Sequence, residues 1–396
     1  MKRRDFLKIL TLLASSSLLG VSGSKPKEKI LVVGAGIVGV TIAYELSRAG
    51  VDVHLIDKKY PGSQASGNSF SWINATYPKL PFNYNFLSQM GIEAYKVLSK
   101  EVNLKIKWSG SLEWFEDNEI ESDSFVKLEK LMGYKKYTPV EVINSKQASK
   151  LEPSITFGDS RRIIFSKSDG AIDTDAAIEE LTKKILMYGG KISYPCEYLA
   201  SNIKNGKLFS IDSSLGEIEA TKIIFAGGID SNALVKKTVL KEPTPGIILR
   251  SKSFKKIIDR MVIGPGIHMH QQDDGVIYFG EQDGAPPTHK ERLSNKPNNI
   301  PDFYKAQHIN NMLEKTKTFV KNISDIEIDK ISVGWRPLPL DGLPVIGWLP
   351  KQKDTYIATM HSGISLAAIV AKLVTQEVLE GTSSSLLDEF RPTRFV

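Results

Sequence analysis

Three glycines at positions 34, 36 and 39 constrain this chain more than any other feature of its sequence. They follow an uninterrupted apolar run, Ile30 to Val33, which is typical of a parallel strand buried on both faces. In this spacing Gly34 makes a tight turn, Gly36 lets the backbone approach a pyrophosphate, and Gly39 lets a helix pack close to the strand. The pattern therefore predicts a strand, a phosphate-binding turn and a helix that runs to about Arg48.

The residues after this helix complete a βαβ unit of about thirty residues. Gly50 ends the helix, Val51 to Ile56 forms a second strand, and Asp57 follows where a carboxylate meets a ribose hydroxyl. Because a carboxylate favours a free 2′-hydroxyl, FAD or NAD fits the motif better than NADP, and the motif does not choose between those two. An ordinary βαβ turn without a ligand is the alternative.

Composition describes an ordinary globular protein. The 396 residues allow two packed domains, 24% of the residues are charged and 41% are hydrophobic, and the net charge of +7 includes no basic block with interleaved aromatics. Cys196 is the only cysteine, so neither an intramolecular disulfide nor a thiol-rich metal site is expected. We therefore expect no nucleic-acid partner and no metal.

The first 24 residues have the pattern of a targeting segment. Residues 2–8, KRRDFLK, precede a moderately apolar run from Ile9 to about Val21, and the paired arginines resemble a twin-arginine export signal. This predicts a periplasmic protein. The region after the apolar run has no clear A-x-A cleavage motif. The alternatives are therefore an uncleaved anchor, which would give peripheral membrane association, and an N-terminal arm of a cytoplasmic protein.

Two internal segments carry small residues that would let the backbone approach a ligand. Tyr60 to Ala75 is rich in small and hydroxylated residues, although its composition alone favours a surface loop. Lys222 to Phe225 is an apolar strand that ends in Ala226 and Gly227. We expect this strand to bring its small-residue end close to the ligand of the first glycine turn.

The C-terminal segment repeats the order of strand, glycine turn and helix. After the sequence SVGWRP at 332–337, a strand is expected at Thr355 to Thr359, a turn at Met360 to Gly363, and a helix from about Ile364 to Leu379. A second helix N-terminus can therefore face the same ligand.

The rest of the chain is expected to form helices and mostly antiparallel strands. Helical patterns occur at Phe86–Val102, within Pro139–Pro153, at Thr174–Tyr188 with a cap at Asp173 or Thr174, and at Tyr304–Phe319. Strand patterns occur at Lys105–Phe115, Leu208–Ile211, Glu217–Glu219, Pro243–His270 and Gly275–Gly280, and Pro286–Pro301 is a polar loop.

Four of these motifs together resemble the FAD-dependent D-amino-acid oxidase superfamily, which includes glycine and sarcosine oxidases and D-amino-acid dehydrogenases. They are the N-terminal glycine turn, the ASGN loop at 65–68, the IIFAGG strand end at 223–228, and the WRP, DGLPVIG and HSGI sequences between 335 and 364. The resemblance covers the chain from residue 27 to its C-terminal tail.

The resemblance implies an α/β fold with a discontinuous Rossmann-type FAD-binding domain and a mostly antiparallel β-sheet substrate domain. The FAD-binding domain is expected from residues 27–80, 154–235 and 331–396. The substrate-binding domain is expected from residues 81–153 and 236–330. FAD is expected to be non-covalently bound, because no cysteine lies near the C-terminal block where some members attach it.

The resemblance also implies a set of FAD contacts. The glycine turn would hold the pyrophosphate, Asp57 and Lys58 the ribose, the backbone of Tyr198 the adenine end, and the start of the last helix the isoalloxazine. The full expected set is Gly34, Ala35, Gly36, Ile37, Val38, Gly39, Asp57, Lys58, Ser66, Gly67, Asn68, Tyr198, Ala226, Gly227, Gly363, Ile364 and Ser365.

Arg336 stands where this superfamily has its substrate-carboxylate arginine. A planar guanidinium grips a carboxylate through two parallel hydrogen bonds, whereas the alternative is a structural salt bridge beside a proline turn. His361 is a second expected substrate contact, or else a packed, neutral residue. Tyr278, with His268 and His270, could tune the protonation of a substrate amine, or these residues serve the core or surface. No catalytic acid or base is demanded.

The function implied is FAD-dependent oxidation of the C–N bond of a small amino acid, either a D-amino acid or an N-substituted glycine, by hydride transfer to flavin N5. Oxidation of a 2-hydroxy acid with the same carboxylate grip is one alternative. An exported flavoprotein that relays electrons without small-molecule turnover is another. Oxygen, a quinone or a protein can each serve as electron acceptor, and the sequence carries no signal for an oligomeric state.

Overall fold

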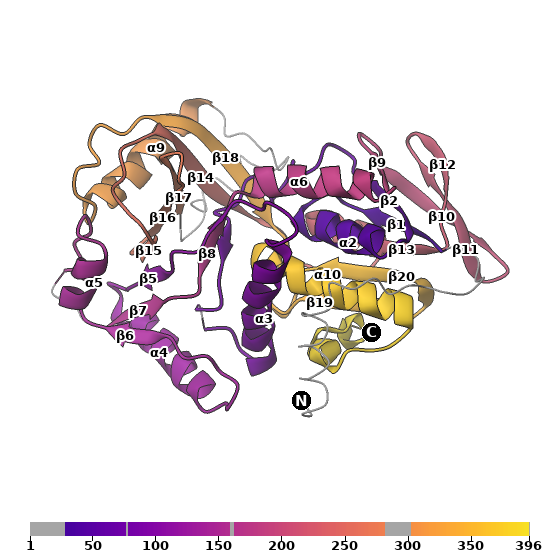
Figure 1. Cartoon of the computed structure of the whole chain (residues 1–396), viewed down its shortest axis with the longest axis horizontal. Coiled ribbons are helices and arrows are strands. Elements are labelled where there is room, and N and C mark those ends of the chain that lie inside the picture. Colours follow the sequence, from indigo (N-terminus) through magenta and orange to yellow (C-terminus); the bar gives the residue numbers. More distant parts are fainter. Residues whose placement is uncertain (1–27, 77, 159–161, 282–301, 396) are drawn as a thin grey trace.

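The computed structural model describes residues 28–76, 78–158, 162–281 and 302–395. The predicted twin-arginine segment and the polar loop expected at 286–301 lie outside these residues. The described chain folds into two parts that lie side by side, each built on one large sheet (Figure 1). None of the helices in these ranges combines the length and apolar character that crossing a bilayer requires.

The first sheet has the strand order β19-β20-β13-β1-β2-β9 and is parallel except for the β19–β20 pair. Its strands are β1 (Lys29–Val33), β2 (Asp52–Ile56), β9 (Lys191–Ser193), β13 (Lys222–Phe225), β19 (Val345–Leu349) and β20 (Gln352–Thr359). Ile30 and Val32 pack into one core cluster, whereas Leu31 and Val33 pack into a second cluster. Because neighbouring strand residues point to opposite faces, this alternation confirms a strand buried on both faces.

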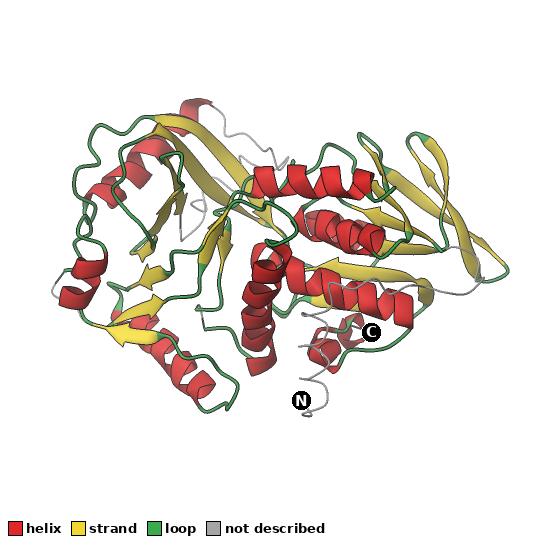
Figure 2. Ribbon diagram, viewed as in Figure 1, coloured by secondary structure: helices red, strands yellow, loops and turns green. Residues whose placement is uncertain are grey.

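Helices cover one face of this sheet and a β-meander covers the other (Figure 2). Helix α2 (Ile37–Arg48) packs between α6 (Thr174–Met187) and α10 (Gly363–Glu380), and α3 (Phe82–Leu98) packs on α10. The side chain of Asp173 caps α6 by accepting from the backbone N–H of Ala176 at 3.1 Å, as the sequence predicts. The meander consists of β10 (Tyr198–Lys204), β11 (Lys207–Ser213) and β12 (Gly216–Glu219).

The second sheet has the order β18-β14-β17-β16-β15-β5-β7-β6, and among its described pairs only β15–β5 is parallel. Its strands are β5 (Ser111–Glu113), β6 (Glu141–Ile143), β7 (Ile163–Ser166), β14 (Thr244–Ser253), β15 (Met261–Gly264), β16 (Ile267–Gln271), β17 (Val276–Glu281) and β18 (Ile328–Arg336). The expected mostly antiparallel sheet is therefore confirmed. Its apolar face packs against α9 (Asp302–Lys317), whose Met312 is fully buried.

Short elements complete the fold. A three-stranded sheet, β3-β8-β4, lies where the two parts meet. The remaining elements are β3 (Trp72–Ile73), β4 (Ile106–Lys107), β8 (Gly170–Ile172), α4 (Asn118–Met132), α5 (Ser145–Leu151), η1 (Gly228–Asp230), α7 (Ser231–Val235), η3 (Ser385–Phe390) and η4 (Pro392–Phe395). No counterpart of α4 was among the expected elements.

The observed division of the chain differs from the expected segments at three places. Helix α3 was assigned to the substrate-binding domain, but its Phe86, Leu87 and Tyr95 belong to the core cluster of the first sheet. Strand β7 and most of β18 were assigned to the FAD-binding domain, but both pair within the second sheet. The reason is that β18 leads directly from one sheet into the other, so the boundary follows Arg336 and does not fall within the strand, where it was expected.

Candidate active site

A cavity of about 900 Å³ lies between the two large sheets. Its lining includes the carboxyl ends of β1, β13 and β20 and the N-terminal ends of α2 and α10. The second sheet contributes residues of β14, β15, β16, β17 and β18 to the opposite wall. Ligands of open α/β sheets bind beyond the carboxyl ends of parallel strands, and helix N-termini favour anions, so both features mark this cavity as a binding site.

The first glycine turn has the close packing that its sequence predicts. Gly34 has φ +105°, and a Cβ atom on it would lie 2.6 Å from the carbonyl oxygen of Ala226. A Cβ atom on Gly39 would lie 1.9 Å from the carbonyl oxygen of Gly34. The turn therefore tolerates no side chain at either position, and it brings the end of β13 against the start of α2.

Polar groups around this turn are already oriented. The Asp57 carboxylate accepts the backbone N–H of Ala35 at 2.7 Å and that of Lys59 at 2.8 Å, while burial raises its pKa from the ordinary value. Ser66 Oγ accepts the backbone N–H of Ile37 at 3.0 Å. Asp57 and Ser66 thus flank the N-terminus of α2 from two sides and both line the cavity.

The second glycine turn opens onto the same cavity. Gly363 begins α10 and lines the cavity together with Ile364 and Ser365. Ser365 Oγ accepts the backbone N–H of Asn74 at 3.0 Å and donates to the carbonyl of Trp72 at 3.1 Å. These bonds fix the 60–75 loop against α10. The loop is therefore part of the cavity wall, contrary to the surface position that its composition favours.

Most of the predicted cofactor contacts line the cavity. They are Gly34, Gly36, Ile37, Val38, Asp57, Lys58, Ser66, Asn68, Tyr198, Ala226, Gly227, Gly363, Ile364 and Ser365. Ala35, Gly39 and Gly67 are not among the lining residues. Ala35 and Gly39 instead shape the turn, and Gly67 binds Arg250, which donates to its carbonyl oxygen at 2.8 Å.

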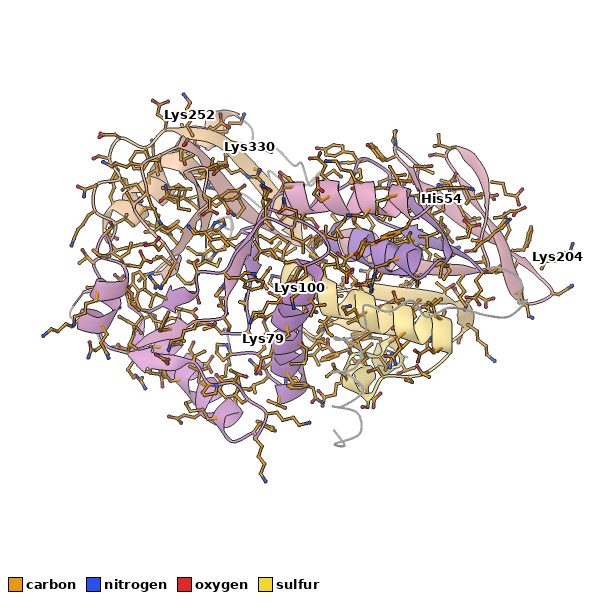
Figure 3. The ribbon with its side chains drawn as sticks, viewed as in Figure 1. His54, Lys79, Lys100, Lys204, Lys252 and Lys330 are labelled. Carbon is orange, nitrogen blue, oxygen red and sulfur yellow. The ribbon has the colours of Figure 1, made fainter. Side chains whose placement is uncertain are left out.

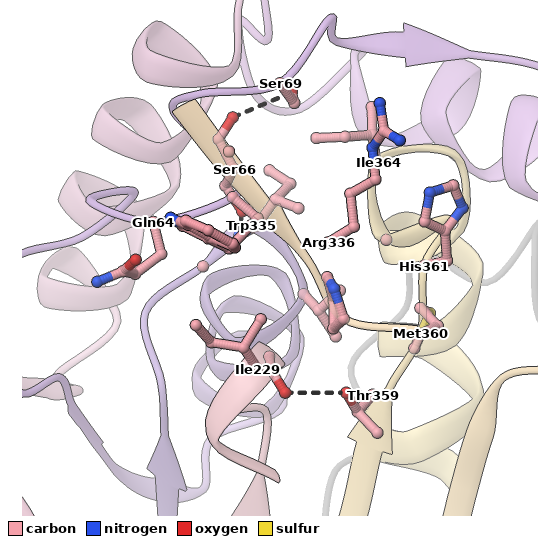
Figure 4. A pocket seen from close by; sticks show the side chains of 18 of the residues that line it. Gln64, Ser66, Ser69, Ile229, Trp335, Arg336, Thr359, Met360, His361 and Ile364 are labelled. Atoms are coloured by element: carbon pink, nitrogen blue, oxygen red, sulfur yellow. Dashed lines mark hydrogen bonds between the residues drawn. The ribbon is translucent and has the colours of Figure 1, made fainter. Parts of the chain in front are cut away.

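The substrate side of the cavity carries Arg336 at the end of β18, with His361 facing it (Figure 4). The guanidinium packs over Gly246. A Cβ atom added to Gly246 would lie 3.0 Å from Nη2 of Arg336. No hydrogen bond or ion pair is found between the Arg336 side chain and the described residues, and its pKa is lowered by burial and raised again by Glu281. This arrangement favours the ligand-binding interpretation over a structural salt bridge.

Two histidines of this wall are held neutral. Burial, with the Arg336 charge as a second cause, lowers the pKa of His268 to about 3. His361 is exposed to the open cavity, but desolvation by the surrounding wall, the Arg336 charge and the Lys79 charge lower its pKa to about 4. Nδ1 of His268 has no hydrogen-bond partner among the described residues. The expected neutral His361 is therefore found facing the cavity, not packed away from it.

The prediction that Tyr278 contacts the substrate is not supported, because Tyr278 lies outside the cavity lining. Its ring stacks on His270 at 4.7 Å between centroids and lies 4.8 Å from the guanidinium carbon of Arg250. His270 contacts the carbonyl of Phe70 at 3.0 Å and is likewise outside the lining. Tyr278 points to the cavity face of the sheet. It lies two residues along β17, or about 7 Å, from Gly280, which is the residue paired with His268.

Sequence reasoning missed several residues of the wall. Phe70, Lys79, Tyr84, Glu113, Ile248, Ile263, Glu281 and Trp335 all line the cavity. Glu113 could have been found, because it is a charged residue between the apolar residues Leu112 and Trp114. Lys79, labelled in Figure 3 near the start of α3, follows a loop and carries no comparable signal.

The residues present fit an FAD molecule. Two helix N-termini, a side-chain-free turn and the Asp57 carboxylate suit a pyrophosphate and a ribose, and the cavity continues to a polar wall. That wall offers the buried Oδ1 of Asn74, which has no hydrogen-bond partner among the described residues. Within the same ranges, no group of His, Cys, Asp and Glu has the arrangement of a metal site.

Comparison with known proteins agrees with this geometry. Glycine oxidase from Bacillus licheniformis is 24% identical over 88% of this chain and 92% of its own length. Sarcosine oxidase subunit beta from Rhizobium meliloti (strain 1021) is 22% identical over 89% of this chain and 86% of its own length. The crystal structure of L-proline dehydrogenase from P. horikoshii superposes with a TM-score of 0.80 at 23% identity, covering 93% of this chain and 98% of that one.

A family model matches most of the chain. The model for "DAO: FAD dependent oxidoreductase" spans residues 29–377, which include both glycine turns, Asp57 and Arg336. The protein is therefore a member of the DAO family of FAD-dependent oxidoreductases.

Proposed function

We propose that this protein oxidises the C–N bond of a small amino acid, either a D-amino acid or an N-substituted glycine. The observation that carries the proposal is the guanidinium of Arg336, which lines the cavity without a hydrogen bond or ion pair to the described residues. A substrate carboxylate satisfies such a group through two parallel charge-assisted hydrogen bonds. Two relatives are named as a glycine oxidase and a sarcosine oxidase subunit, and these names support the same substrate class.

Arg336 would orient the substrate. A bidentate contact fixes the carboxylate and thereby determines which face of Cα turns toward the glycine-turn side of the cavity. FAD, when bound there, supplies the two-electron acceptor for the hydrogen that leaves Cα. The apolar side chains of Phe70, Ile248 and Trp335 line the same region and limit the access of water.

The neutral histidines suit an amine that reacts in its unprotonated form. With pKa values of about 3 and 4, His268 and His361 carry no charge at neutral pH. His268 Nδ1, which lacks a partner among the described residues, can accept a hydrogen bond or donate one according to its tautomer. An amine without its extra proton has the lone pair that favours departure of hydride from the neighbouring carbon.

We further propose that FAD is bound without a covalent link. Cys196 lines the cavity near Tyr198, and its backbone N–H donates to the carbonyl of Asp57 at 2.7 Å. Cys196 therefore lies at the end of the site expected to hold the ribose. Export through the twin-arginine pathway, with oxygen, a quinone or a protein as electron acceptor, remains part of this proposal and rests on residues 1–24 of the sequence.

Anaerobic reduction of the FAD-loaded protein tests the proposal. Glycine, sarcosine, D-alanine and D-proline would be mixed with the protein, and D-lactate would serve as the 2-hydroxy acid control. Bleaching of the visible flavin absorption by at least one amino acid, and not by D-lactate, is expected. Bleaching by D-lactate alone would favour hydroxy-acid oxidation, and no bleaching by any compound would favour an electron-relay role.

A further inference from the structure

The wall of the cavity holds a lysine that the proposed reaction does not use. Lys79 is 8% exposed and lines the cavity. Its ammonium donates to Ser88 Oγ at 3.1 Å and lies 5.4 Å from the ring centroid of Tyr84. Among the described residues it has no other hydrogen bond and no ion pair, so two of its three N–H donors have no protein acceptor there.

A buried carboxylate lies near this lysine but is occupied by other donors. Asp169 is fully buried and accepts hydrogen bonds from the side chains of Trp72, Thr76, Ser111 and Ser166 at 2.6–3.0 Å. Its charge raises the pKa of Lys79, whereas burial lowers that pKa to about 8. Asp169 therefore acts on Lys79 through its field and does not bind the ammonium.

Glu113 is a second buried acid that interacts with the charge of Asp169. It is 1% exposed, lines the cavity, and its Oε2 has no hydrogen-bond partner among the described residues. Burial, with Asp169 as a second cause, raises its pKa to about 8, so Glu113 is mostly protonated at neutral pH. A protonated carboxyl group can donate a hydrogen bond to an anion.

The cavity wall continues without interruption from the Arg336 region to Glu113. His268 of β16 is in register with Ile263 of β15, which is in register with Glu113 of β5, and all three line the cavity. Neighbouring strands are about 4.8 Å apart, so Glu113 lies about 10 Å beyond His268 across the sheet. This wall is longer than a glycine or sarcosine molecule needs.

Lys79 is also close enough to the substrate side to act on His361. Its charge and that of Arg336 both lower the pKa of this histidine, which lines the cavity beside Arg336. The cavity thus presents two cations near His361, each without a carboxylate bound to it in the described chain. A ligand with two carboxylates can pair with both of them.

We propose that Lys79 binds a second carboxylate of the substrate, in the cavity that the buried Glu113 also lines. This inference rests on the proposed function and narrows it, because it assigns the protein to amino acids that carry two carboxylates. The first carboxylate lies on Arg336 and the second reaches Lys79. An isolated buried ammonium gains most from an anionic partner, since water and protein dipoles are scarce around it.

The binding test uses paired ligands that need no turnover. Succinate and glutarate each have two carboxylates, and their half-amides succinamate and glutaramate have the same shape with one carboxylate. Isothermal titration calorimetry of the FAD-loaded full chain should give dissociation constants at least tenfold lower for one of the diacids than for its half-amide. In Lys79→Met the diacid should bind no better than the half-amide, whereas exposed Lys100→Met should leave the preference intact.

Anaerobic flavin reduction by D-aspartate, D-asparagine, D-glutamate, D-glutamine and iminodiacetate extends the test to substrates. The acids should reduce the flavin at least tenfold more efficiently than the amides, and Lys79→Met should remove that difference. Equal binding of diacids and half-amides by the wild type would overturn the inference. A Lys79→Met variant that still prefers diacids would also overturn it. The same holds for a Lys79→Met variant that binds all ligands equally weakly and has a shifted flavin spectrum and reduction potential, because Lys79 would then serve the cofactor.

The two proposals fail in different ways. If glycine or D-alanine reduces the flavin and the diacids neither bind nor react better than their half-amides, the proposed oxidation of amino acids holds and the role of Lys79 does not. If the diacids show the Lys79-dependent binding but no amino acid reduces the flavin, the binding inference holds and amino-acid oxidation does not.

Discussion

Within the described part of the chain, Arg336 is held in place by packing and no carboxylate pairs with it. Its guanidinium rests on Gly246, where the absence of a side chain leaves room for the planar group. Glu281 contributes only a field that raises the Arg336 pKa against the effect of burial. A cation in this position costs free energy until an anion arrives, so binding and orientation of a carboxylate are coupled at this residue.

Replacement of Arg336 is expected to affect substrate binding first. Arg336→Lys keeps the charge but loses the two-pronged geometry, and Arg336→Met loses both. We expect the substrate dissociation constant in anaerobic flavin reduction to rise about tenfold to a hundredfold for the lysine variant, and further for the methionine variant. The control is Arg162→Lys, because Arg162 is exposed and pairs with Glu121. This variant should react as the wild type does. An unchanged dissociation constant in Arg336→Met would exclude this residue from the substrate site.

Histidine protonation should make the fold sensitive to mild acid. His268 and His270 each have a folded-state pKa of about 3, below the ordinary 6.5. Because the unfolded chain binds these protons first, the stabilisation is complete above pH 6.5 and is lost as the pH falls toward the folded values. The free energy of unfolding should fall by up to about 1.4 kcal/mol per pH unit for each histidine.

Urea unfolding between pH 6.5 and pH 5, where most carboxylates stay ionised, measures this slope. His270→Gln can keep a donor for the Phe70 carbonyl and removes one titrating group, so its slope should be smaller than that of the wild type. Equal slopes in the two proteins would show that His270 does not titrate with unfolding.

At the scale of elements, the sequence predicted the glycine turns well and the walls around them poorly. The turns are local: strand, glycine spacing and helix all lie within one short segment, so their geometry follows from neighbouring residues. Glu113 enters the cavity because β5 pairs with β15, and the Lys79 ammonium lies against Ser88 and Tyr84 of α3. The pairing of β5 with β15 joins segments that are far apart in the chain, so the sequence does not reveal it. For the same reason Tyr278 was expected in the cavity, although the cavity lies two residues further along its strand.

The close contact between α2 and the turn of β1 should tolerate no added methyl group. In Gly39→Ala the new Cβ would lie 1.9 Å from the Gly34 carbonyl oxygen, so α2 must move away from the turn. We expect a loss of about 1–3 kcal/mol in the free energy of unfolding and at least tenfold weaker FAD binding, measured by denaturation and by titration of the apoprotein. Gly133→Ala is the matched control, because Gly133 has φ −66° and its Cβ would make an ordinary 3.4 Å contact. Wild-type FAD affinity in Gly39→Ala would contradict the tight-turn account.

At the scale of the whole molecule, chain segments from both ends meet at one site. Gly36 and Gly363 lie more than three hundred residues apart in the sequence and line the same cavity. The C-terminal tail then returns beneath the sheet, where η3 and η4 pack on β19. Arg391 holds this tail by donating to both carboxylate oxygens of the buried Glu377, at 2.8 and 2.6 Å.

Loss of this clamp should destabilise the entire fold. Arg391→Met leaves the Glu377 carboxylate, which is 1% exposed, without its counter-charge. Removal of one partner of a buried pair costs about 3–5 kcal/mol, so the unfolding midpoint in urea should fall clearly. The partly exposed pair of Arg394 with Asp341 gives the comparison, since Arg394→Lys should cost about 1 kcal/mol or less. Similar midpoints for the two variants would mean that the tail is not held by Glu377.

The central claim is that the cavity between the two glycine turns holds one FAD molecule per chain. Titration of the apoprotein with FAD, followed by visible absorption of the protein after removal of free cofactor, tests this claim directly. We expect saturation at one FAD per chain and a yellow protein. A protein that stays colourless at every FAD concentration, while it remains folded by circular dichroism, would contradict it.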